Sequence, residues 1–166
     1  TTTLPSCPYG VCEFEAETSS RAGLFANTAY PLSKNGFLNV AVQAGAITKA
    51  RTVDPISDFN LGGFLQLSGL RTDQLSGDYL GFGRAVYENI PKMMFIFLPL
   101  LGRGVYVGGS FEAGNTWATR DDISFKGMYT AGSVFVAADT WLGPFYLAWG
   151  RASGGASSFY IFLGRI

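Results

Sequence analysis

Few residues in this sequence could act as a nucleophile, a proton carrier or a metal ligand. The chain has no histidine and two cysteines, so a Ser–His–Asp triad would lack its base and a zinc site most of its usual ligands. Cys7 and Cys12 are close enough for a tight disulfide in an oxidising compartment, and two free thiols are the alternative.

The serine-hydrolase motif Gly-x-Ser-x-Gly is also incomplete. Residues 108–112 read Gly-Gly-Ser-Phe-Glu, without the closing glycine, and residues 150–154 place the serine one position late. Asp121 and Asp122 fall in a hydrophilic stretch, where solvation explains them. We therefore expect no enzymatic activity, no cofactor and no metal.

The composition is unusual for a soluble domain. Only 14% of the residues are charged, against roughly a quarter in typical soluble domains, while 15% are aromatic and 22 are glycines. The net charge is zero and no basic run is present, which argues against nucleic-acid binding. The longest apolar stretch, 93–101, contains Pro99 and is shorter than the roughly 20 residues of a spanning helix. A closed β-barrel is the other structure that can cross a bilayer.

Alternation with a period of two predicts strands that are apolar on one face and polar on the other. In residues 37–48, Val40 and Val42 share the apolar face, and Asn39 and Gln43 share the polar face. Residues 103–117 repeat the pattern, with Val105, Val107, Phe111, Ala113 and Trp117 on one face and Tyr106, Ser110, Glu112 and Thr116 on the other. Glu112 is therefore expected to face the lumen. Further strands are predicted at residues 79–89, 129–140, 145–150 and 157–166.

The stretch 11–30 keeps one phase throughout and reads either as one long strand or as a hairpin. In it Glu13, Glu15 and Glu17 form an acidic stripe, which fits the wall of a polar lumen or, more weakly, a cation site.

The connections differ in length. Short turns are expected at 32–36 and 141–144, and longer connections include 118–126 and the glycine-rich stretch 51–77. Short turns on one side and longer loops on the other are typical of outer-membrane barrels. Counting strands places the 51–77 loop, the 118–126 connection and a further short connection at 152–157 outside the cell, and the turns at 32–36 and 141–144 in the periplasm.

The long loop contains a motif that resembles a known family. Residues 61–70 read Leu-Gly-Gly-Phe-Leu-Gln-Leu-Ser-Gly-Leu. The stretches 75–79, 105–117, 138–144 and 160–165 follow it in the family's order. Together they resemble the outer-membrane barrel of patatin-like phospholipase autotransporters, of the bacterial surface-antigen superfamily and type V secretion. The motif and the position after it comprise Gly62, Gly63, Phe64, Leu67, Ser68, Gly69, Leu70 and Arg71.

The resemblance implies a sixteen-stranded barrel that follows periplasmic domains in the chain. It also implies that the long loop folds back into the lumen, where an Arg-Gly-aromatic tip docks on acidic residues of the wall. The matching positions here are Ser68, Gly69 and Leu70, so the arginine is absent. Either Arg71 replaces it and docks on Glu112, or Arg71 is a solvated loop residue.

Two further features depart from the family pattern. The chain ends at Ile166, whereas such barrels usually end in an aromatic residue. It holds seven clear strands, or eight if 11–30 is a hairpin. It is thus about half of a larger barrel or a small closed eight-stranded barrel, since a closed single-chain barrel requires an even number.

The expected fold is therefore an all-β, antiparallel, up-and-down transmembrane barrel in one domain, 1–166, with an N-terminal segment at 1–10. The expected function is an anchor and translocation domain in the bacterial outer membrane. Its partners would be the bilayer with its lipopolysaccharide, the insertion machinery, and the remaining strands of a larger barrel or further copies. The alternatives are a small structural outer-membrane protein and a soluble lipocalin-like binder.

Overall fold

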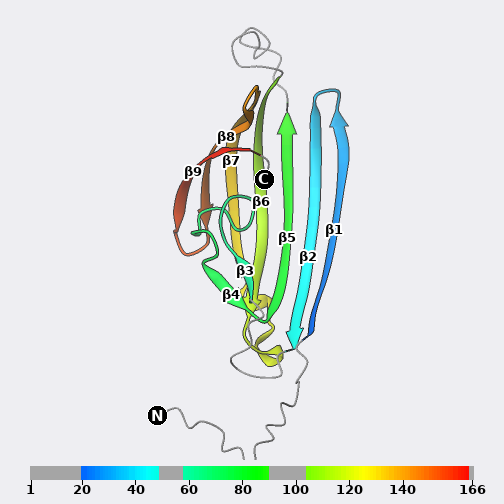
Figure 1. The fold of residues 1–166 in the computed structure, drawn as a ribbon, viewed down its shortest axis with the longest axis vertical. Coiled ribbons are helices and arrows are strands. Elements are labelled where there is room, and N and C mark those ends of the chain that lie inside the picture. The colour runs from blue at the N-terminus through cyan, green and yellow to red at the C-terminus, as the bar shows by residue number, and fades with distance from the viewer. Residues whose placement is uncertain (1–19, 49–57, 90–103, 165–166) are drawn as a thin grey trace, which may run out of the picture.

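Seven strands form one antiparallel sheet in which every strand pairs with its nearest sheet strand along the chain (Figure 1). The computed structural model describes residues 20–48, 58–89 and 104–164. The sheet strands in spatial order are β1 (Ser20–Ser33), β2 (Gly36–Thr48), β5 (Tyr79–Asn89), β6 (Gly104–Trp117), β7 (Tyr129–Thr140), β8 (Gly143–Ala152) and β9 (Ser157–Leu163). A separate two-stranded sheet joins β3 (Phe59–Leu61) to β4 (Leu75–Gly77).

The predicted all-β class is confirmed, and the strands predicted at 79–89 and 129–140 have the bounds of β5 and β7. Of the stretch 11–30, the described part belongs to one strand, β1, and contains no hairpin. The earlier part of that stretch lies outside the described residues, as do Cys7, Cys12 and the acidic stripe.

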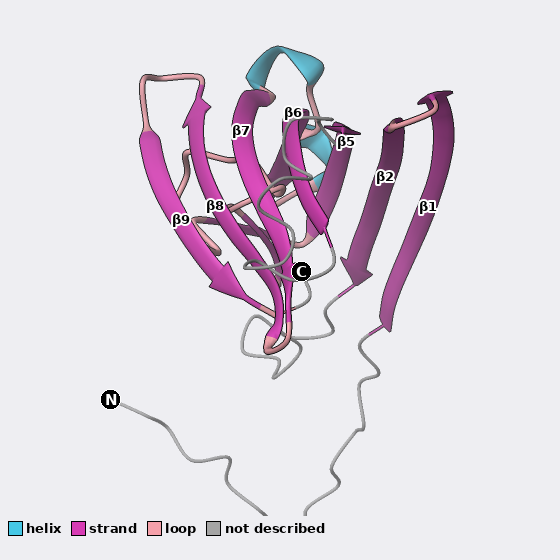
Figure 2. Cartoon of the chain, turned by 90° about the horizontal axis from the view of Figure 1, so that it is seen from above, coloured by secondary structure: helices cyan, strands magenta, loops and turns pink. Residues whose placement is uncertain are grey.

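The sheet is strongly curved, and β1 and β9 are its two edges in the part of the chain that the structure describes (Figure 2). Side chains alternate between an outer and a concave face. On β2, Ala41 and Ile47 are buried on the concave face, whereas Val42 is 51% exposed on the outer face. Residues that lie opposite each other on paired strands point to the same face. Val40 lies opposite Ala85, and Ala85 lies opposite Phe111, which is exposed on the outer face.

Charge is almost confined to the concave face of these seven strands. By register and alternation, the concave charged residues are Arg21, Arg84, Glu88, Glu112 and Asp139. Arg151 is the only charged residue that the seven described strands place on the outer face, and it lies near the end of β8. The apolar and polar faces predicted for residues 37–48 and 103–117 correspond to the outer and concave faces.

The ends of the sheet differ in their connections. Tight turns join β1 to β2 and β7 to β8 at one end. At the other end, the β6–β7 connection carries two 3-10 helices, η3 (Arg120–Asp122) and η4 (Phe125–Gly127). None of the helices in the described ranges is long and apolar enough to cross a membrane.

Candidate functional site: a segment docked on the concave face

Residues 58–77, here called the docked segment, lie against the concave face of the sheet. The segment begins with β3 and ends with β4, and the pairing of these strands closes its base. Leu67 and Ser68, in its middle, have no exposed surface. Hydrogen bonds from the segment reach β5, β6 and β9, so it crosses most of the sheet's curvature. Both buried apolar clusters of the described residues lie between this segment and the sheet.

The centre of the contact is the buried carboxylate of Glu112 on β6. The backbone N–H of Ser68 donates to Oε2 at 2.6 Å, and the Ser68 hydroxyl donates to Oε1 at 2.7 Å. The Ser110 hydroxyl also donates to Oε1, and its oxygen lies 2.7 Å from that of Ser133. A carboxylate removed from water needs such donors to offset its lost hydration. Glu112 thus holds the segment through hydrogen bonds from uncharged groups.

The second set of polar contacts joins the segment to β9. The Gly69 N–H donates to the Tyr160 hydroxyl at 2.8 Å, and that hydroxyl donates to the Leu70 carbonyl at 3.0 Å. The Ser158 hydroxyl donates to the Gly69 carbonyl at 2.9 Å. These bonds satisfy the backbone on both sides of the Gly69–Leu70 peptide, which would otherwise be buried without partners.

Two glycines allow the close approach of backbone to backbone. Gly69 has φ +108°, and a Cβ there would lie 2.5 Å from the backbone nitrogen of Ala152. On the wall, a Cβ at Gly150 would lie 2.5 Å from the Cβ of Ser68. Neither position can hold a side chain without displacing the segment.

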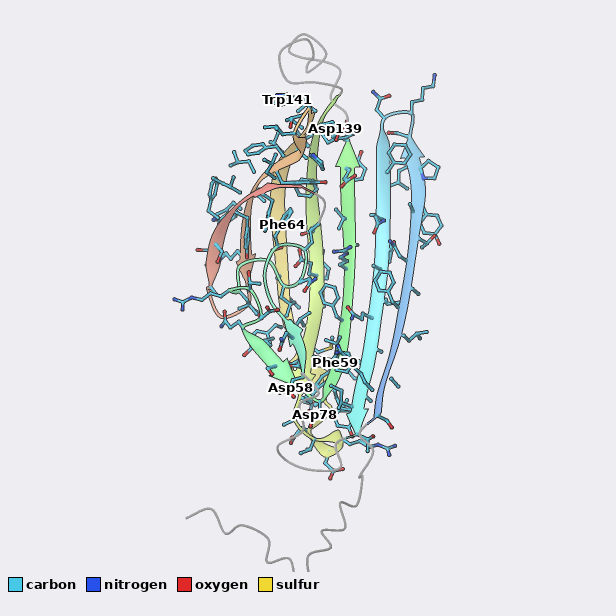
Figure 3. All side chains as sticks on the ribbon, in the orientation of Figure 1. Asp58, Phe59, Phe64, Asp78, Asp139 and Trp141 are labelled. Atoms are coloured by element: carbon cyan, nitrogen blue, oxygen red, sulfur yellow. The ribbon has the colours of Figure 1, made fainter. Side chains whose placement is uncertain are left out.

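Phe64 anchors the segment in an aromatic cluster on β7, β8 and β9. Its ring lies 5.6 Å from those of Phe135 and Tyr160 and 5.7 Å from that of Phe162, measured between centroids. The approach to Phe135 is edge-on, at 82°, one of the arrangements that aromatic pairs prefer. Figure 3 shows Phe64 between the two ends of the sheet, with Asp139 and Trp141 toward one end and Asp58, Phe59 and Asp78 toward the other.

Further contacts lie on β5, β2 and β1. Arg84 donates through Nη1 to the Leu65 carbonyl at 3.2 Å. Phe59 fits over Gly45, where a Cβ would lie 2.3 Å from the ring, and the Arg21 guanidinium lies 4.3 Å from the centre of the Phe59 ring. The segment is therefore fastened at its tip and at its base.

Near the end of the sheet where tight turns join its strands, the docked segment does not cover the concave face. A polar cavity of about 250 Å³ lies there, lined by Glu88, Tyr106, Asp139 and Tyr146 among others. The Tyr106 hydroxyl donates to Asp139 at 3.0 Å. Among the described residues, the concave side thus has a region filled by the docked segment and a separate polar cavity.

The loop-motif residues have distinct places in the docked segment. Gly62 and Gly63 have φ of +137° and +108°, and a Cβ at Gly62 would lie 2.3 Å from the Arg71 carbonyl oxygen. Arg71 is exposed, and its N–H donates to the Gln74 side chain. Of the two alternatives for Arg71, the structure agrees with the exposed loop residue, because Ser68 and not Arg71 contacts Glu112.

Sequence reasoning missed Ser158, Tyr160 and Gly150 as partners of the segment. They lie 80 to 90 residues from the tip in round numbers, and no local pattern links them to it. The even positions of β9 carry a signal in retrospect, because Ser158 and Tyr160 alternate with the apolar Phe159 and Ile161.

No family model matches the chain, and a search among curated proteins gives no match.

Proposed function

We propose that this chain forms part of an outer-membrane β-barrel that anchors a secreted or surface protein and serves as its translocation domain, with the docked segment as a plug in the lumen. The patatin-like family resemblance supplies the class of protein. The distribution of charge over the two faces of the sheet is the observation that carries the proposal.

The outer face supports contact with lipid. Leu24, Phe111 and Val134 are at least 60% exposed there, and Arg151 is the one charge on this face of the described strands. A soluble sheet with one solvated face would carry polar residues at alternate positions along that face. A band of exposed aliphatic and aromatic side chains is instead what a membrane barrel presents to hydrocarbon.

The concave face supports a plugged lumen. The docked segment binds the sheet through Glu112 and Tyr160. At its tip, Ser68 stands where the family that the sequence resembles typically has an arginine. Because the bonds to Glu112 come from a backbone N–H and a hydroxyl, no second buried charge is needed. Release of these bonds would open the space that the segment fills.

The proposal is tested on the full natural gene product, isolated from the membranes of a bacterial host. We expect it in the outer-membrane fraction, extractable only with detergent, with a gel mobility that changes on heating as the barrel unfolds. Single-channel recording in planar bilayers should show small openings for the wild type and larger ones for Glu112→Ala. A protein that stays dispersed in buffer without detergent would overturn the proposal and favour the lipocalin-like binder.

A further inference from the structure

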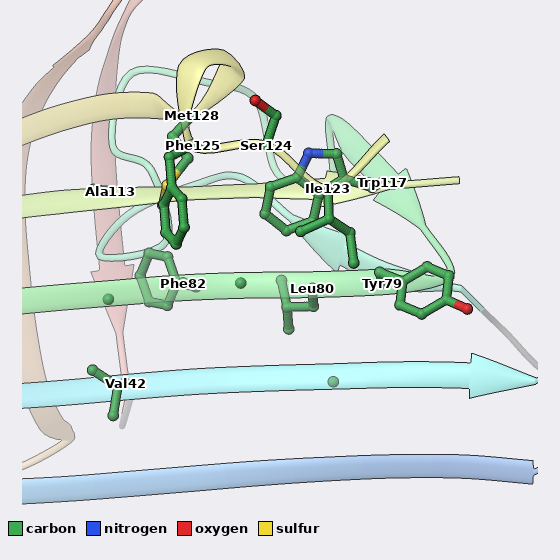
Figure 4. Close-up of a pocket in the computed structure, with 13 residues that line it drawn as sticks. Val42, Tyr79, Leu80, Phe82, Ala113, Trp117, Ile123, Ser124, Phe125 and Met128 are labelled. Atoms are coloured by element: carbon green, nitrogen blue, oxygen red, sulfur yellow. The ribbon is translucent and has the colours of Figure 1, made fainter. Parts of the chain in front are cut away.

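A second recess lies on the outer face, beneath the β6–β7 connection. Its volume is about 430 Å³, within the range of small-molecule sites. The side chains that line it are almost all apolar and come from β2, β5, β6 and the connection (Figure 4). It lies on the side of the sheet opposite the docked segment, which neither lines nor fills it.

The recess exists because small residues on β5 lie between larger neighbours. Gly83 forms its floor, and Val42 on β2 and Ala113 on β6 lie on either side of Gly83 in the register of the sheet. The indole of Trp117 closes one end, since a Cβ at Gly81 would lie 3.2 Å from its ring. Phe125 and Met128 of the β6–β7 connection border it from above. Phe125 is 89% exposed, although a phenyl ring would normally be covered.

We propose that this outer recess binds one acyl chain of a membrane lipid. The inference rests on the proposed function, because it takes the outer face to be surrounded by lipid. The recess is continuous with the exposed apolar band of that face, so the nearest available ligand is a hydrocarbon chain.

The dimensions of the recess favour an alkyl chain over an α-helix of another protein as its ligand. β2 and β6 are two strand spacings apart, about 10 Å between their backbones. An α-helix with its side chains is about 10–12 Å across and does not fit between Val42 and Ala113, which flank Gly83 in the register of the sheet. An extended alkyl chain is about half as wide and fits lengthwise.

The charges near the recess also indicate that the acyl chain, and not the lipid headgroup, is recognised. The β6–β7 connection carries Arg120 and Lys126 together with Asp121 and Asp122, so its charges balance. This connection provides no excess positive charge to select an anionic headgroup. A zwitterionic lipid with brominated acyl chains is therefore a suitable probe, because bromine quenches tryptophan fluorescence at short range.

The experiment uses the full natural protein in an unbrominated detergent. Trp141→Phe and Trp149→Phe leave Trp117 as the only tryptophan of this chain, and any tryptophans in other parts of the protein are replaced as well. Phosphatidylcholine with brominated chains is then titrated into the micelles. We expect quenching of Trp117 that saturates at about one lipid per protein. Gly83→Leu should abolish the saturable part, because the new side chain fills the recess; its Cβ has ordinary contacts, the nearest at 3.7 Å.

Ala85→Leu is the matched control, because it adds the same side chain on the same strand and face but does not line the recess. It should leave the saturable quenching unchanged. Phe125→Ser, in an exposed connection, is a second test that does not depend on filling the sheet, and it should weaken binding about ten-fold.

Quenching that rises in proportion to the brominated fraction without saturation would overturn the inference. Equal saturable quenching in Gly83→Leu and Ala85→Leu would also overturn it. So would a protein dimer that Gly83→Leu dissociates while the brominated lipid has no effect on quenching. Heat-dependent gel mobility of the same samples separates the two proposals. If the protein is heat-modifiable and membrane-bound but shows no saturable quenching, only the acyl-chain site is ruled out. If the protein needs no detergent, the proposed function is ruled out as well.

Discussion

The outer and concave faces of the sheet are built on the same backbone but differ in what covers them. On the outer face of β6 and β7, Phe111 and Val134 are 63% and 60% exposed. On the concave face of the same strands, Glu112 is fully buried and Phe135 is 4% exposed, because the docked segment lies over them. On these two strands, burial therefore depends on the face that a residue occupies and not on its hydrophobicity alone. The docked segment covers the concave face, whereas Phe111 and Val134 on the outer face stay exposed.

The largest test of this contrast places the same charge on either face of β2. If the outer face meets lipid as proposed, Val40→Arg should destabilise the protein in the membrane by about 2 to 4 kcal/mol, because it places a guanidinium in hydrocarbon. Asn39→Arg, one residue away on the concave face, should have a much smaller effect. Urea unfolding in lipid vesicles, followed by gel mobility, measures both. Equal effects would mean that the outer face does not meet hydrocarbon.

The second test removes the acceptor at the centre of the docked segment. Glu112→Ala leaves the N–H and hydroxyl of Ser68 without their partner, which should lower the stability of docking by about 1.5 to 3 kcal/mol. Hydrogen exchange read by mass spectrometry should show faster exchange in residues 64–70.

Hydrogen exchange of the backbone amides that pair β5 with β2 serves as the internal control for Glu112→Ala. If it accelerates as much as the segment does, the variant has loosened the whole sheet and Glu112 is not specific to docking.

The third test compares a glycine on each face. Gly150→Ala should displace the tip of the segment, since the new Cβ would lie 2.5 Å from the Ser68 Cβ, with an overpacking effect of about 1 to 3 kcal/mol. Gly83→Ala on the outer face meets only ordinary contacts and should leave docking unchanged. Protection of residues 64–70 from hydrogen exchange distinguishes them, and protection that survives Gly150→Ala would contradict the close fit.

The smallest expected effect concerns a single hydroxyl. Tyr160→Phe keeps the ring beside Phe64 but removes the hydrogen bonds to Gly69 and Leu70. It should lower the stability of docking by about 0.5 to 1.5 kcal/mol. Exchange of the Gly69 amide should accelerate while that of the Leu65 amide changes less, because Leu65 donates to Ser68. Equal acceleration at both amides would show that the tip opens as one unit.

The sequence predicted the sheet well because its strands follow a simple alternation. Residues 79–89 and 129–140 became strands with the expected bounds, and Glu112 took the expected face. The short strands β3 and β4 could not be predicted, since three residues are too few to show a period. Their pairing depends on the turn geometry of Gly62 and Gly63 and on the sheet beneath them.

The partner of Glu112 was harder to predict than its orientation. Charge alone suggested Arg71, three residues beyond Ser68, as the opposite group. The observed contact depends instead on a close approach: a Cβ at Gly150 would lie 2.5 Å from that of Ser68, so residue 68 can lie against the sheet only where β8 carries a glycine. Such a constraint joins residues of the loop, β6 and β8 and becomes visible only when the three are placed together.

The left-handed backbone of the docked segment has a consequence for the order of folding. Leu65 and Leu67 have φ of +60° and +71°, values that branched, bulky residues adopt only when their surroundings hold them there, at about 1 to 3 kcal/mol each. The contacts that hold the tip include Ser158 and Tyr160 on β9, the last strand described. The segment can therefore reach its final shape only after β9 has joined the sheet. A segment that is synthesised before β5 to β9 is thus expected to be among the last parts of the described chain to reach its native conformation.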